Sequence, residues 1–100
     1  MPRAMNESLE AAREAALTNP DDADAHARFG RACLEAGDLA RAIESLQRAA
    51  RLAPEDAAIR TALGRAWLAA ADPEKAVFHL RRAAALDPED GDVRNLLARA

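Results

Sequence analysis

A 34-residue segment of this chain is followed directly by a second copy of itself. Residues 57–90 align with residues 23–56 without a gap, and 16 of the 34 positions are identical. The identical pairs include Gly30 and Gly64, Ala42 and Ala76, Leu46 and Leu80, and Pro54 and Pro88. A period of this length, with small and apolar residues at helical spacing, predicts a solenoid of stacked helix pairs. We therefore expect a single all-α domain over residues 1–100.

Short acidic turns separate the expected repeats. Pro20, Pro54 and Pro88 are each followed by two acidic residues, the second of which is an aspartate. A proline ends the preceding helix, and an aspartate caps the next one. The turns divide the chain into a half repeat, two full repeats and another half repeat, at residues 6–22, 23–56, 57–90 and 91–100. With two helices in each full repeat, we expect about five helices stacked antiparallel.

The charge of the chain argues against two classes of partner. It has 14 basic and 17 acidic residues, which are mixed along the sequence and give a net charge of -3. A protein that binds nucleic acid normally presents a basic face with stacking aromatics, whereas aromatic residues make up only 3% of this chain. No apolar run approaches the ~20 residues that span a bilayer. We expect neither a nucleic-acid partner nor a membrane partner.

The single cysteine and the two histidines do not show the pattern of a catalytic or metal site. Cys33 has no partner for an internal disulfide, which favours a reducing compartment and predicts a cytoplasmic location. His26 lies seven residues before Cys33, about 10 Å away along a helix, which is beyond contact distance for a thiol-imidazole pair. His79 has no neighbouring ligand cluster, and a metal site needs three or four ligands. We expect no enzyme activity, no cofactor and no bound metal.

The repeat resembles that of the tetratricopeptide repeat family. Each full copy has a large residue followed by glycine in its first helix, Phe29 and Gly30 or Leu63 and Gly64, then an alanine early in its second helix and a closing proline. The resemblance implies antiparallel helix pairs stacked into a right-handed superhelix. It also implies a concave face, lined by the first helix of each repeat, that binds a peptide or a helix of a partner protein. The clamp of lysines, asparagines and arginine by which one subfamily holds a C-terminal carboxylate is absent.

By the register of that family, two rows of residues face the concave groove: Arg31, Arg65 and Arg99, and one helical turn earlier Ala27, Thr61 and Asn95. Arg31 can pair with Glu35 at the next turn. Arg65 meets Ala69 there, so we expect its guanidinium to be free. A ladder of arginines suits the carboxylates of an acidic peptide. A solvated row without function is the alternative, since arginine is the common cation of this chain.

The two ends of the chain indicate a second function class, which is self-assembly. The chain opens with the second half of a repeat and closes with the start of a first half, so one copy can continue the superhelix of another. The contact would bury apolar residues from both ends: Leu9, Ala12 and Ala16, with Val93, Leu96 and Leu97. We expect first a non-catalytic scaffold that binds a partner protein. The alternative is a homo-oligomer joined through its end helices.

Overall fold

Six helices make up residues 2–100 of the structure, a computed structural model that describes side chains from residue 9 onward. They are α1 (Pro2–Thr18), α2 (Ala23–Glu35), α3 (Leu39–Leu52), α4 (Ala57–Ala69), α5 (Pro73–Leu86) and α6 (Gly91–Arg99). Residues 2–100 contain no strand. The predicted all-α fold is confirmed. The structure has six helices rather than about five, because the last segment forms a complete short helix behind a cap at Asp90.

An aspartate caps each of the helices α2 to α6. Its carboxylate accepts hydrogen bonds from backbone N–H groups of the first turn, at 2.9 Å for Asp22 and 3.0 Å for Asp56. Three more aspartates do the same for α3, α5 and α6: Asp38, Asp72 and Asp90. These bonds satisfy N–H groups that have no partner within the helix. The spacing of the aspartates therefore determines where five helices begin.

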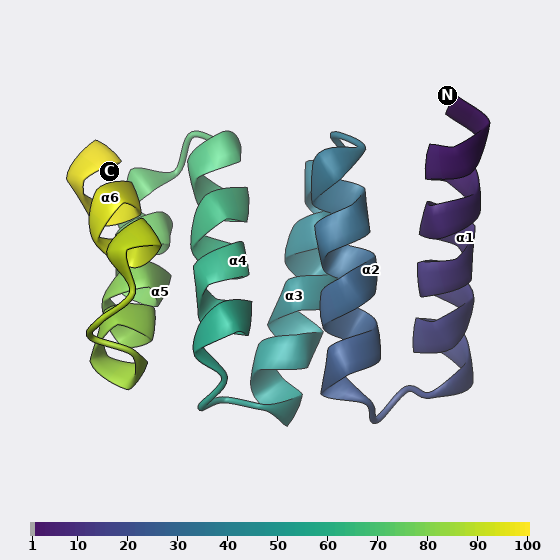
Figure 1. Cartoon of the computed structure of the whole chain (residues 1–100), viewed down its shortest axis with the longest axis horizontal. Coiled ribbons are helices and arrows are strands. Elements are labelled where there is room, and N and C mark those ends of the chain that lie inside the picture. The colour runs from purple at the N-terminus through teal and green to yellow at the C-terminus, as the bar shows by residue number, and fades with distance from the viewer. Residues whose placement is uncertain (1) are drawn as a thin grey trace.

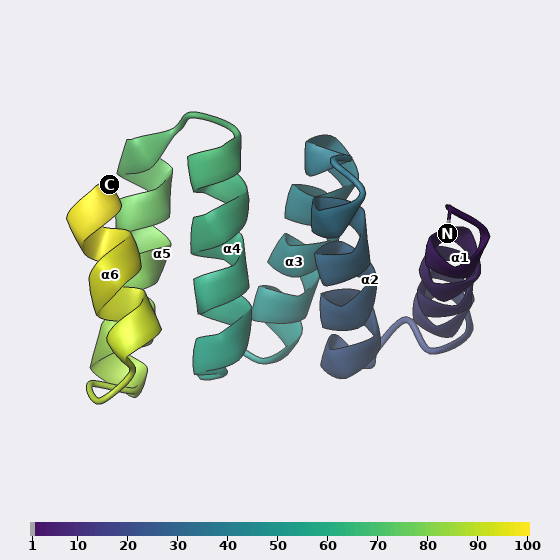
Figure 2. The same cartoon turned by 45° about the horizontal axis from the view of Figure 1, so that its top comes forward.

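The helices lie side by side along the longest axis of the molecule, which measures 35 Å (Figure 1). Each helix contacts the next one along the chain, and α4 also contacts α2 and α6. The helices α2, α4 and α6 thus form one layer, with α3 and α5 behind it (Figures 1 and 2). Side chains that are distant in the sequence therefore reach one surface across α2, α4 and α6.

The core is built from alanine and leucine at corresponding positions of the two hairpins. Six of these residues are completely buried: Ala42, Leu46 and Ala49 in α3, and Ala76, Leu80 and Ala83 in α5. Gly30 lets α2 approach α3 closely, since a Cβ atom at this position would lie 2.6 Å from Cγ of Leu46. The small residues of the repeat thus determine how near the two helices of a hairpin pack.

The turn between the helices of each hairpin needs a residue in the left-handed conformation. Gly37 has a φ of 83°, and Ala71, its counterpart in the next repeat, has a φ of 61°. This conformation costs a residue with a side chain roughly 1–2 kcal/mol. The Asp72 cap and Pro73 in the first turn of α5 favour the start of the next helix at this turn.

The apolar residues predicted to join copies end to end are largely used within the chain. Val93 and Leu96 of α6 are 1% and 7% exposed, because they complete a core cluster with three residues of α5. Ala16 is also buried, and three residues are half-buried: Leu9, Ala12 and Leu97. The expectation that Val93 and Leu96 offer an open end surface is therefore wrong.

Candidate functional site

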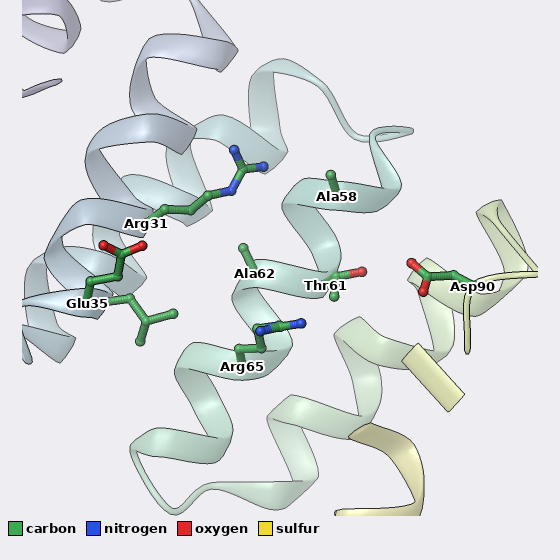
Figure 3. Close-up of a pocket in the computed structure, with 8 residues that line it drawn as sticks. Arg31, Glu35, Ala58, Thr61, Ala62, Arg65 and Asp90 are labelled. Atoms are coloured by element: carbon green, nitrogen blue, oxygen red, sulfur yellow. The ribbon is translucent and has the colours of Figure 1, made fainter. Parts of the chain in front are cut away.

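A pocket of about 350 Å³ opens across α2 and α4 and extends to the start of α6 (Figure 3). Eight residues line this pocket, hereafter the groove: Arg31, Leu34 and Glu35 of α2, Ala58, Thr61, Ala62 and Arg65 of α4, and Asp90 before α6. The four residues of α4 have the spacing i, i+3, i+4 and i+7, which places them on one helical face. That face of α4 is the middle of the groove, with α2 on one side and Asp90 on the other.

The hollowed surface continues from the groove toward α1. A second pocket of about 430 Å³ lies between α1 and α2, and it shares Arg31 and Glu35 with the groove. Ala11, Ala12 and Ala15 form much of its α1 side. These side chains are small and leave the surface between α1 and α2 hollow. The surface open to a partner therefore extends beyond the groove, and Arg31 stands near the centre of this longer surface.

Half of the predicted binding residues come together in the groove: Arg31, Thr61 and Arg65. Asn95 and Arg99 are exposed on α6 but do not line it. Ala27 is unavailable to a partner, because it is 1% exposed and packs in the core beneath residues of α3 and α4. Its predicted place on the groove is therefore wrong, and the second row is reduced to Thr61 and Asn95.

Arg65 forms an ion pair, contrary to the expectation that its guanidinium is free. Its Nη2 atom lies 3.8 Å from Oδ2 of Asp92 in α6. The side chains are 50% and 74% exposed, and exposed pairs of this kind contribute roughly 0–1 kcal/mol. A carboxylate from a partner can therefore replace Asp92 at small cost. The pair links two repeats, which is why the helical spacing within α4 did not predict it.

The groove carries acids as well as arginines. Glu35 and Asp90 line it together with Arg31 and Arg65. Among the side chains that the structure describes, Arg31 has no ion pair, and Figure 3 shows its guanidinium extending from α2 toward α4. The groove therefore presents charges of both signs around the small apolar side chains of α4 and Leu34.

Thr61 offers a partner less hydrogen-bonding capacity than its position indicates. Its hydroxyl donates to the backbone carbonyl of Ala57 at 2.9 Å, which leaves an acceptor and a methyl group for a ligand.

The predictions missed five residues of the groove: Leu34, Glu35, Ala58, Ala62 and Asp90. Four of them lie three, four or seven residues from Arg31 or Arg65 along the same helix, and so share a helical face with that arginine. The sequence predicts them when the whole helical face is considered instead of one position per turn.

Cys33 and His26 are both occupied structurally. Burial raises the pKa of the Cys33 thiol, and the nearby Asp38 carboxylate raises it further, so the sulfur stays protonated and unreactive. The buried His26 ring donates from Nε2 to the carbonyl oxygen of Pro20 at 2.8 Å.

No group of three His, Cys, Asp or Glu side chains from residue 9 onward is placed to hold a metal ion. No helix in the described part of the chain has the length and apolar character of a membrane span.

Stacked helical hairpins with a groove across their first helices define a helical-repeat protein of the solenoid class. The model of the tetratricopeptide repeat family matches the sequence twice, over residues 3–66 and 34–100. The chain therefore belongs to the tetratricopeptide repeat family, as its repeat predicted. No curated protein sequence matches it.

Solved structures share the fold over most of the chain. The first tetratricopeptide repeat domain of Spaghetti (RPAP3), solved with an HSP90 peptide, superposes with a TM-score of 0.92 at 17% identity, over 98% of this chain and 78% of that one. MamA superposes with a TM-score of 0.89 at 20% identity, over 95% of this chain and 56% of its own. The Cut9-Hcn1 tetramer of APC/C gives 0.75 at 28% identity, over 77% and 15%. The chain thus spans only part of each structure.

Proposed function

We propose that the chain is a non-catalytic protein-interaction scaffold that binds a peptide or a helix of a partner protein in the groove. The observation that carries this proposal is the presence of Arg31 and Arg65, from two different repeats, on one pocket with Ala58 and Ala62 between them. Guanidinium groups bind carboxylates through two parallel hydrogen bonds, and the alanines leave room for a backbone to approach.

The preferred segment has separated acidic residues. Arg31 has no ion pair among the described side chains, and Arg65 has only the exposed pair with Asp92. Glu35 and Asp90 repel a continuous run of acids, so a ligand with acids spaced by small or apolar residues is favoured over a polyanion. Attraction between exposed charges is screened by salt, and binding should weaken as the ionic strength rises.

The HSP90 peptide bound by the first repeat domain of Spaghetti supports this proposal. Its sequence is SRMEEVD, which contains three acidic residues, and that domain has the same fold over 98% of the present chain. A solenoid with this fold can therefore hold an acidic peptide. The buried thiol of Cys33 is consistent with a reducing compartment, and we propose a cytoplasmic location for the scaffold.

Peptide affinities of single variants test the proposal. A fluorescent peptide with three glutamates separated by alanines is titrated with the chain, and a glutamine version serves as the reference ligand. We expect Arg31→Ala and Arg65→Ala each to weaken binding roughly tenfold, about 1.4 kcal/mol. Arg48→Ala is the matched control, because Arg48 is exposed on α3 and pairs with Glu44 outside the groove. Equal affinity of all three variants, or of both peptides, would contradict the proposal.

Self-assembly through the end helices is less favoured by this structure. Val93 and Leu96 are already buried within the chain, which leaves less apolar surface to drive a head-to-tail contact. We expect sedimentation over a hundredfold concentration range to give a constant monomer mass. A mass that grows with concentration, and that falls back when Leu97 is replaced by Glu, would favour assembly instead.

A further inference from the structure

A separate pocket, of about 470 Å³, lies among α3, α4 and α5, apart from the groove and from the pocket beside α1. It is lined by Arg60 and Leu63 of α4, Gln47, Ala50 and Arg51 of α3, and His79 of α5, among others. Arg60 and Leu63 lie about half a turn around α4 from the residues of the groove, since successive residues are 100° apart. The pocket therefore opens on the face of α4 that is opposite to the groove.

A hydrogen bond across the pocket determines the state of its histidine. Nη1 of Arg60 lies 3.2 Å from Nδ1 of His79. A guanidinium only donates, so Nδ1 accepts and the ring hydrogen is on Nε2. Burial lowers the pKa of His79, and the charge of Arg60 lowers it further, so the ring is neutral at neutral pH. The ring of Phe78 packs edge-on against it at 5.1 Å. His79, which lines the pocket, thus has one N–H donor, on Nε2.

The arginines around His79 carry positive charge that the described residues do not neutralise. Nε of Arg60 is buried and has no hydrogen-bond partner, which is uncommon for a charged donor. Burial and the nearby charge of Arg82 lower the pKa of Arg60. From residue 9 onward, no carboxylate forms an ion pair with Arg51, Arg60 or Arg82. The adjoining turn holds two acids: Asp56 uses its carboxylate to cap α4, and Glu55 is exposed and forms no ion pair among the described residues.

We propose that this pocket binds a phosphate group, either free or carried on a side chain of a peptide. Arg51 and Arg60 line it with two guanidinium groups, and His79 adds a neutral N–H donor. A phosphate carries up to two negative charges and several acceptor oxygens, so one group can satisfy donors from three helices at once. A carboxylate has one charge and would leave more of the local positive charge uncompensated. The site is independent of the groove and of the function proposed for it.

The equivalent position of the preceding repeat lacks the pair of Arg60 and His79. Arg60 and His79 are replaced there by His26 and Ser45, and Arg51 by Leu17. His26 is satisfied by the carbonyl oxygen of Pro20. The hollow that includes Ser45 is smaller, about 180 Å³. Arg13 and Arg41 line it, but the acid Glu44 lines it too, and Arg41 pairs with Asp38 at 3.5 Å. The phosphate site therefore results from substitutions at three positions of the second repeat and is not a general property of the fold.

Titration of the isotope-labelled chain with inorganic phosphate tests the site directly. Nuclear magnetic resonance follows the ring nitrogens of His79 and Nε of Arg60, with sodium chloride at equal ionic strength as the reference. We expect saturable shifts with phosphate only. Arg60→Gln and Arg51→Gln should each weaken binding at least tenfold, the effect of losing one charge-assisted contact. Arg94→Gln is the matched control, because Arg94 has the same repeat position as Arg60, is exposed on α6 and does not line the pocket.

A second arm identifies the source of the phosphate. A phosphoserine peptide and its serine counterpart are titrated in the same way. Tighter binding of the phosphoserine peptide than of inorganic phosphate assigns the site to a modified partner, and equal affinity assigns it to the free ion. The proposal is overturned by shifts that do not saturate, by equal shifts with chloride, or by loss of binding in Arg94→Gln to the same extent as in Arg51→Gln. Arg51 is exposed, so its variant should keep the fold, which circular dichroism verifies.

Discussion

Gly64 of α4 and Leu80 of α5 pack so closely that a Cβ atom on the glycine would lie 2.5 Å from Cγ of the leucine. Gly30 and Leu46 have the same relationship in the preceding hairpin, at 2.6 Å. Both leucines are completely buried and have little room to withdraw. The spacing of the helices in each hairpin, and with it the position of α2 and α4 along the groove, depends on these two glycines.

Replacing Gly64 with alanine should therefore destabilise the fold. An inserted methyl group in a packed core costs about 1–3 kcal/mol, whereas alanine gains at most ~1 kcal/mol in helix propensity over glycine. We expect a net loss of about 1–2 kcal/mol in the free energy of unfolding, measured with urea and circular dichroism. Gly91→Ala is the control, because a Cβ atom there meets nothing within 4 Å. Equal stability of the two variants would show that the contact is not tight.

Ala71 is the opposite case, a position that would benefit from glycine. Its φ of 61° is strained for alanine, and its counterpart in the other hairpin is Gly37. We expect Ala71→Gly to raise the free energy of unfolding by about 0.5–1 kcal/mol, because relief of strain exceeds the entropy that glycine adds to the unfolded chain. The same change at Ala11, which is exposed inside α1, should lower it by about 1 kcal/mol. Loss of stability in both variants would rule out strain at the turn.

His79 should make the stability depend on pH. Burial and Arg60 lower its pKa in the folded chain, so just below neutral pH the unfolded chain binds more protons than the folded one. The contribution of His79 is fully present above its unfolded pKa of about 6.5 and is lost as the pH falls below that value. We expect the free energy of unfolding to fall between about pH 7.5 and 5.5, before most carboxylates titrate, and to fall less in His79→Gln. Identical slopes for both chains would contradict this account.

Features that repeat within one copy were predictable from the sequence, whereas features that join two copies were not. The capping aspartates and the glycines act within one turn or one hairpin, so the 34-residue period shows them directly. The pair of Arg65 with Asp92 joins two copies, because Asp92 belongs to the half repeat that follows the second full repeat. Those side chains meet only because of the angle at which successive helices stack. The spacing of residues along one helix does not determine that angle.

The ends of the chain show the same limit. Val93 and Leu96 have the apolar spacing of a helical face, which predicts that they are covered but not what covers them. In the structure they pack on α5 of the same chain. Ala27 likewise has the register of a groove residue, yet the packing of α3 and α4 buries it. Periodicity identifies the face of a helix, and the neighbouring helices decide whether that face stays open.

The most direct test of the central claim, that partners bind across the first helices of the repeats, is a map of backbone amide shifts on adding the acidic peptide. We predict that the largest shifts fall on the groove residues of α2 and α4, around Arg31, Thr61 and Arg65, and that Arg65→Ala reduces them. Residues on the opposite face of α4, around Arg60, should move little. Shifts concentrated on α3 and α5, with the groove unchanged, would contradict the claim.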